Sequence, residues 1–99
     1  MISRQVVVAA PGGLGEEAAG RFCTAARGQP ARVLVVTDDG RSADALSTLA
    51  VVELGVDGGE TVTLTADDGQ PGAQASVDAL AALLAGELDE SGTGTDAPA

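Results

Sequence analysis

The sequence contains no histidine, lysine, tryptophan or tyrosine, and its only aromatic residue is Phe22. Histidine and lysine are two of the side chains that most often act as general bases or that activate a nucleophilic serine or cysteine. Their absence rules out a catalytic triad, and we therefore expect no enzyme. With a single aromatic ring, the hydrophobic core must be built from valine, leucine and alanine.

Cysteine is also scarce. Cys23 is the only one, which excludes an internal disulfide and fits a reducing compartment. It lies on the apolar stripe of an expected helix, so we interpret it as an inert core thiol and not as a nucleophile, which would have to be exposed. No apolar stretch is long enough to span a membrane and no signal peptide precedes the first expected strand, so we expect a cytoplasmic protein.

Positive charge is the third shortage. Five arginines face fifteen acidic residues, which gives a net charge of −10. This balance argues against binding to nucleic acid or to an anionic membrane, since both require clustered cations. It favours a partner with a basic patch, or it only keeps the protein soluble. The acidic pairs at 38–39 and 67–68 adjoin glycines without the spacing of a calcium loop, so we expect turns there and neither metal nor cofactor.

Hydrophobic periodicity divides the chain into elements in the order β-α-β-β-α-β-α. We expect strands at 5–10, 32–37, 41–43 and 60–66, and helices at 16–27, 47–53 and 72–88. Short antiparallel strands with all helices on one side form an open-faced α+β sandwich, here a four-stranded antiparallel sheet covered by three helices. We place this domain at residues 1–90 and expect a disordered tail at 91–99, where periodicity ends.

Alternation within the strands predicts which side chains face the helices. One set should point inward: Val6, Val8, Val33, Val35, Val62 and Leu64. The other should line the open face: Val7, Leu34 and Val36 together with Thr61, Thr63 and Thr65. Exposure to water costs little for threonine but is unfavourable for a cluster of three large apolar side chains. We therefore expect weak homodimerisation or partner binding through Val7, Leu34 and Val36.

Several local motifs, taken in their order and spacing over residues 3 to 90, resemble the HPr family, the small phosphocarriers of the bacterial sugar phosphotransferase system. They are Ala10-Pro11-Gly12-Gly13-Leu14, Phe22 with Ala26 and Gly28, Asp39-Gly40-Arg41-Ser42-Ala43, Ser47, Leu54-Gly55-Val56 and Gly59-Glu60-Thr61-Val62-Thr63-Leu64. The resemblance implies the same open-faced fold.

The resemblance breaks at the signature of the family, Gly-Leu-His-x-Arg-Pro-Ala, in which the histidine accepts phosphate and the arginine steadies it. The corresponding stretch here begins at Gly13 and places Gly15 at the histidine position, Glu17 at the arginine position and Ala18 at the proline position. A helix N-terminus attracts anions, but Glu16 and Glu17 already supply negative charge there. We therefore expect a divergent member that cannot transfer phosphohistidine, with Glu16 and Glu17 facing a partner.

A second family feature is a serine at the start of the small helix, which many bacteria phosphorylate for regulation. Ser47 occupies that position, and two interpretations stay open: a helix N-cap, or a site modified by a kinase or another modifying enzyme. The modified site needs nearby side chains that a partner can contact, for which we name Thr48, Leu49 and Val51. Leu46 stands where the family usually has a basic residue.

Three functions are compatible with these residues. The first is a regulatory or adaptor module that docks on partner proteins through the Ser47 helix and lacks the phosphotransfer chemistry. The second is a carrier protein in which Ser47 bears a phosphate or another covalently attached group that partner enzymes process. The third is a degenerate phosphocarrier without activity. Fold analogy does not separate them.

Overall fold

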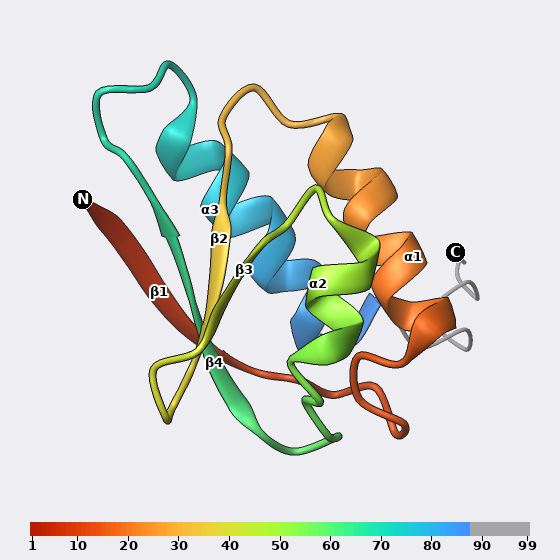
Figure 1. Cartoon of the computed structure of the whole chain (residues 1–99). Coiled ribbons are helices and arrows are strands. Elements are labelled where there is room, and N and C mark those ends of the chain that lie inside the picture. Colours follow the sequence, from red (N-terminus) through yellow and green to blue (C-terminus); the bar gives the residue numbers. More distant parts are fainter. Residues whose placement is uncertain (88–99) are drawn as a thin grey trace.

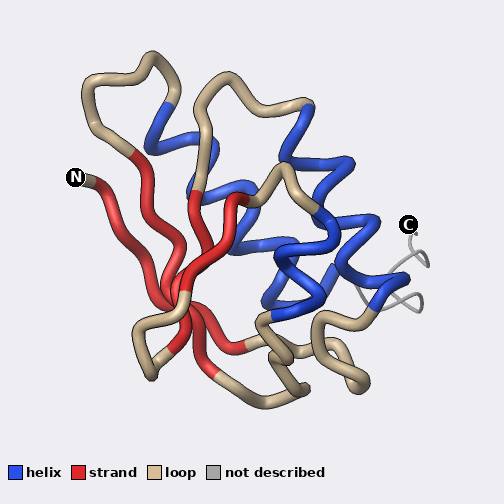
Figure 2. Tube along the Cα trace, in the orientation of Figure 1, coloured by secondary structure: helices blue, strands red, loops and turns tan. Residues whose placement is uncertain are grey.

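The chain folds into one antiparallel sheet covered on one side by helices, as the computed structural model of residues 1–87 shows (Figure 1). The strands are β1 (Ile2–Val7), β2 (Leu34–Thr37), β3 (Ser42–Asp44) and β4 (Thr61–Ala66), hydrogen-bonded in the order β1-β4-β2-β3. The helices are α1 (Glu16–Arg27), α2 (Thr48–Glu53) and α3 (Ala73–Ala82), followed by the π-helical turn η1 (Leu83–Glu87). Figure 2 shows the strands on one side and the helices on the other. The open-faced α+β sandwich is confirmed.

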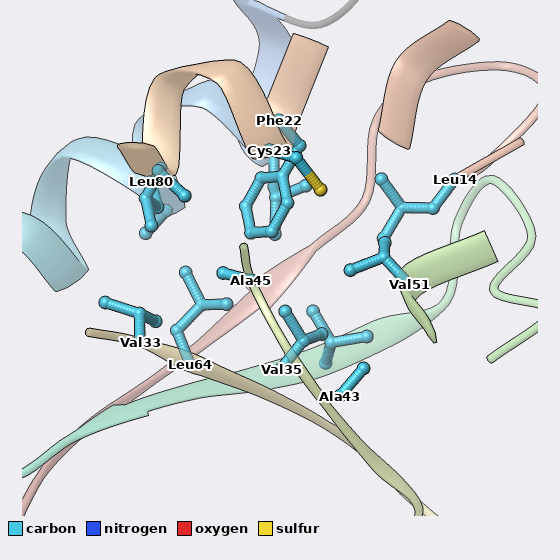
Figure 3. Close-up of a cluster of buried hydrophobic side chains, with 14 of the residues drawn as sticks. Leu14, Phe22, Cys23, Val33, Val35, Ala43, Ala45, Val51, Leu64 and Leu80 are labelled. Atoms are coloured by element: carbon cyan, nitrogen blue, oxygen red, sulfur yellow. The ribbon is translucent and has the colours of Figure 1, made fainter. Parts of the chain in front are cut away.

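The core lies between the sheet and the helices, and Figure 3 shows its central side chains. Phe22 and Cys23 of α1 are both fully buried: the Phe22 ring points toward the sheet, and the Cys23 sulfur points to the side of Leu14 and Val51. Valine, leucine and alanine supply nearly all the rest, as the composition predicts. Of the six strand residues expected to face the helices, five are buried. The sixth, Val6, is only partly buried because β1 lies at the edge of the sheet.

The first strand begins and ends earlier than expected. We expected 5–10, but β1 runs from Ile2 to Val7, and Ile2 pairs with Ala66 at the far end of β4. Residues 3–5 are polar and break the apolar alternation by which a strand is predicted from sequence. A strand at the edge of a sheet is largely exposed and need not show that alternation. Val8 is still bonded to the sheet, since its N–H donates to the Glu60 carbonyl at 2.9 Å. After it, the Ala9 N–H donates to the Leu84 carbonyl of η1.

The last helix is shorter than expected. We expected an uninterrupted helix at 72–88, but α3 covers Ala73–Ala82 and the chain then widens into η1. This wider turn keeps Leu84 buried while its carbonyl accepts the bond from Ala9. Residue 88, the expected domain end at 90 and the expected tail at 91–99 lie outside the described residues.

The open face of the sheet carries the three threonines of β4 in a column between its neighbours. Leu34 and Val36 of β2 lie opposite Thr65 and Thr63, whereas Val7 of β1 lies opposite Thr61 on the other side of the column. The expected continuous cluster of Val7, Leu34 and Val36 is therefore wrong, because the threonine column separates Val7 from the other two. Val7 is 52% exposed and Leu34 39%, and Val36 is half-buried.

Candidate functional site

The N-terminus of α1 begins at Gly15, which stands at the N-cap with an extended backbone (φ −74°, ψ −173°). Its carbonyl accepts a 2.8 Å hydrogen bond from the Ala19 N–H. Glycine offers no side chain to the free N–H groups of the first turn, and Glu16 and Glu17 place two exposed carboxylates beside them. Both carboxylates are favourable at the positive end of the helix dipole and repel a further anion.

A tight crossing of two loops holds this end of α1 in place. Gly13 has a left-handed backbone (φ 67°), and a Cβ atom there would lie 2.1 Å from the Val56 carbonyl oxygen. The neighbouring Leu14 is buried, and its N–H donates to the same carbonyl at 2.9 Å. Across the crossing, a Cβ atom on Gly58 would lie 2.5 Å from the Ala10 carbonyl oxygen. Only glycine fits at either position.

Half of this crossing was not predicted from the sequence. Gly12 and Gly13 were singled out next to Leu14, but Gly58 was not connected with them. The signal available was the pair Gly58-Gly59 shortly before a strand, which is typical of a turn. A turn motif does not predict which distant loop it contacts, so the contact between Gly58 and Ala10 could not be predicted from local sequence pattern.

Acidic side chains stand on both sides of the crossing. Glu16 and Glu17 lie on α1, and Asp57 and Glu60 follow Val56 in the other loop, all exposed. Arg21 offsets Glu17 through an ion pair of 3.4 Å one helical turn on. The excess of carboxylates makes the local potential negative, which disfavours a phosphoryl group and favours a cationic surface.

A shallow, open depression of about 680 Å³ lies beside the exposed side of α1. Gly20 and Ala25 of α1 and Leu83 of η1 contribute apolar surface, and Glu16 and Glu17 form its acidic end. The two carboxylates named as partner contacts thus border a concave surface. Arg21 also lines the depression and pairs with Glu17, so the net charge of these three side chains is negative, which suits a protein segment with a basic side chain.

Helix α2 places the residues of the second candidate site. The Ser47 hydroxyl oxygen accepts a 3.3 Å hydrogen bond from the Ala50 N–H, so Ser47 is the N-cap of α2. Thr48 and Ser47 are half-buried, and Leu49 is 69% exposed. Val51 was expected to contact a partner, and this is wrong: it is fully buried, because it lies on the side of α2 that packs into the core. Leu49 is the large apolar side chain that α2 exposes.

The cap gives a test of whether Ser47 tolerates charge. Aspartate is as good an N-cap as serine, so Ser47→Asp should melt within a degree or two of the wild type, on the order of a few tenths of a kcal/mol. Ser47→Ala removes the acceptor and should cost about 1 kcal/mol. Thermal melting followed by circular dichroism measures both. A Ser47→Asp variant that melts as low as Ser47→Ala would mean that the site does not accommodate a negative group.

The other candidate residues have structural roles. The Asp39 carboxylate accepts hydrogen bonds from the Thr37 hydroxyl and from Arg41 Nε, the latter at 2.9 and 3.1 Å. The bond from Thr37 first, and then those from Arg41, lower the pKa of Asp39. Asp67 accepts from the Gly69 N–H at 2.9 Å. Both aspartates thus stabilise turns. Cys23 is fully buried, as expected for a core thiol.

Within residues 1–87, no cluster of three or more cysteine or acidic side chains is arranged to bind a metal ion. In the same part of the chain, no helix has the length and apolar character needed to cross a membrane.

A family model and a curated relative both match most of this chain. The model of the family described as "PTS HPr component phosphorylation site" matches residues 2–86. The phosphocarrier protein HPr of Streptomyces coelicolor is 38% identical over 90 residues, which cover 91% of this chain and 95% of that protein.

Solved structures agree with this relationship. The crystal structure of a phosphocarrier protein HPr from Bacillus anthracis str. Ames is 25% identical, with a TM-score of 0.77 over 84% of this chain and 95% of that one. HPr-C-His from Thermoanaerobacter tengcongensis has the same fold at 24% identity, with a TM-score of 0.69 over 87% of this chain and 97% of that one.

Proposed function

Because the chain belongs to the HPr family of the phosphotransferase system, we propose that it is a member that works without phosphohistidine transfer, as a non-enzymatic regulatory or adaptor module in the cytoplasm. The observation that carries the proposal is the absence of histidine from the sequence. A phosphohistidine cannot form on such a chain, and Gly15 at the N-cap of α1 has no side chain to replace it.

The proposed docking surface consists of Glu16, Glu17, Thr48 and Leu49. These residues lie on α1 and α2, which pack against each other. The surface combines the exposed Leu49 side chain with two exposed carboxylates and the shallow depression that they border. An apolar anchor beside charges is a common composition for a protein contact. Its charge favours a partner with basic residues.

Restoring histidine alone should not restore phosphate transfer. We expect that Gly15→His is not labelled by the phosphorylated general enzyme of the phosphotransferase system, because Glu16 and Glu17 oppose an incoming phosphate. In this family that enzyme meets basic residues around the first helix, and here the surface is acidic. A matched triple variant, Gly15→His with Glu16→Gln and Glu17→Arg, should gain labelling. Efficient labelling of the single variant would contradict the charge argument.

The docking surface is tested by two charge variants at exposed apolar residues. Leu49→Asp should weaken partner binding at least about tenfold, since an apolar anchor is lost and a charge must be desolvated. Val7→Asp makes the same kind of change at a residue outside the docking surface and should leave partner binding within about twofold. The measurement is quantitative co-purification from the native host. Equal loss in both variants, or loss in neither, would place the contact elsewhere.

A carrier function is the second candidate, and the half-exposed Ser47 hydroxyl favours it. Its oxygen makes one hydrogen bond, to the Ala50 N–H, and stands at a position where added negative charge is favourable. The intact mass of the protein isolated from its native host separates the candidates. A mass increment that maps to Ser47 supports the carrier or a phosphorylated regulator, and an unmodified chain supports a plain docking module.

A further inference from the structure

The outer edge of β1 is an unprotected strand edge. In an antiparallel ladder, alternate residues direct their backbone groups to opposite sides. The Val8 N–H points toward β4 and donates to the Glu60 carbonyl, whereas the Ala9 N–H points to the outer side and donates to the Leu84 carbonyl. The same alternation turns the N–H and C=O groups of Ser3, Gln5 and Val7 outward, and none of them has a hydrogen-bond partner in the part of the chain that the structure describes.

The opposite edge of the sheet is protected. β3 has only three residues, and the carbonyl of its terminal Asp44 already accepts from the Ser47 N–H at 2.9 Å. Charged side chains flank it, in the ion pairs Arg41–Asp39 and Arg32–Asp44. Short length, local covering and charge are the usual means by which proteins prevent pairing at an edge. The contrast singles out β1.

The charge distribution points to the same strand. The first fifteen residues hold no acidic side chain, although the whole chain carries a net charge of −10. The two positive groups at β1 are neutralised within the molecule: Arg4 by Asp78 at 2.9 Å and the N-terminal amine by Asp68 at 3.1 Å. The β1 edge is therefore nearly neutral on a strongly acidic protein, so a second copy meets the least repulsion there.

We propose that β1 pairs with β1 of a second copy of this chain, antiparallel and about a two-fold axis at Gln5, so that the two sheets become one. In this register Ser3 faces Val7 of the second copy and Gln5 faces Gln5. All the outward backbone groups are then paired, and the exposed Val7 is covered. The two Gln5 side chains meet on the open face, where one amide can donate to the other.

The register also avoids placing like charges opposite each other. Arg4 falls opposite Val6 of the second copy, and no acidic residue lies in either strand. A partner of opposite charge would gain nothing from a neutral edge, whereas an identical strand satisfies every outward group. The remaining acidic surface of each copy still repels the other, so the association is weak and becomes stronger as salt screens that repulsion.

The test compares two lysine variants by sedimentation equilibrium at low and high salt. Gln5→Lys puts two cations face to face at the axis and should weaken self-association at least about tenfold. Thr63→Lys is the matched control: it makes the same charge change on the same face, at the residue paired with Gln5 inside the sheet. It should leave the dissociation constant within about twofold. Gln5→Pro removes the outward N–H without a bond to β4 and should abolish association.

Amide resonances locate the contact. With rising protein concentration, the amides of Ser3, Gln5 and Val7 should shift and become protected from hydrogen exchange, while the side-chain methyl resonances of Val36 on the open face should not shift. A protein that stays monomeric at millimolar concentration in high salt overturns the proposal. So does an equal loss in Thr63→Lys and Gln5→Lys, which would assign the contact to the open face.

Discussion

Gly13→Ala is expected to lower the free energy of unfolding by about 3 kcal/mol, and the melting temperature by roughly 15 °C for a domain of this size. Two costs add. Alanine is strained in the left-handed backbone that Gly13 adopts, and its Cβ would lie 2.1 Å from the Val56 carbonyl oxygen. The obstacle is backbone, which cannot rotate away, so the loops on both sides must move.

Two control variants separate these costs. Gly55 has a similar backbone (φ 66°) with no atom within 4 Å of its would-be Cβ, so Gly55→Ala measures the strain alone, about 1 kcal/mol. Gly12→Ala has open space and no left-handed backbone, and should be nearly neutral. Chemical denaturation of the three variants gives the comparison. If Gly13→Ala costs no more than Gly55→Ala, the loops do not cross as closely as described.

Phe22→Ala should destabilise the protein by about 3 to 5 kcal/mol, because it leaves a cavity where the only aromatic ring was. The ring is fully buried between α1, the sheet and α3. Small domains have total stabilities of about 5 to 15 kcal/mol, so this variant should approach the unfolding threshold.

Thr24→Ala is the matched control on the same helix. Thr24 is exposed, its hydroxyl donates to the Gly20 carbonyl, and its loss should be neutral or slightly stabilising. Urea denaturation followed by circular dichroism gives both stabilities. A loss below about 1 kcal/mol in Phe22→Ala would mean that the core closes around the missing ring.

Much of the fold could be predicted because local pattern and tertiary packing agree. Helix α1 has the expected bounds, and Cys23 faces inward as its place on the apolar stripe predicts. The strict alternation of β4 predicted Val62 and Leu64 in the core with the threonines outside. A helix N-cap was one of the two interpretations left open for Ser47, and its hydroxyl does cap α2.

The remaining features depend on contacts between distant segments. β1 starts at Ile2 because it pairs with the end of β4, which no local pattern in residues 2 to 5 shows. Val51 looked available on a short helix, and only the position of α2 against the core shows that it is buried. Val7 was grouped with Leu34 and Val36 on their shared face, but the strand order places β4 between them.

The reactivity of the buried Cys23 thiol can be used to measure local unfolding of this protein. The chain has no tryptophan or tyrosine whose fluorescence could follow unfolding. A thiol reagent cannot reach Cys23 while α1 rests on the sheet, because the residue is fully buried. The rate at which Cys23 is labelled in native buffer therefore depends on how often α1 separates from the sheet. The free energy of this local opening can be calculated from that rate. Partner binding, modification of Ser47 and self-association can then be compared by how much each of them slows the labelling of Cys23.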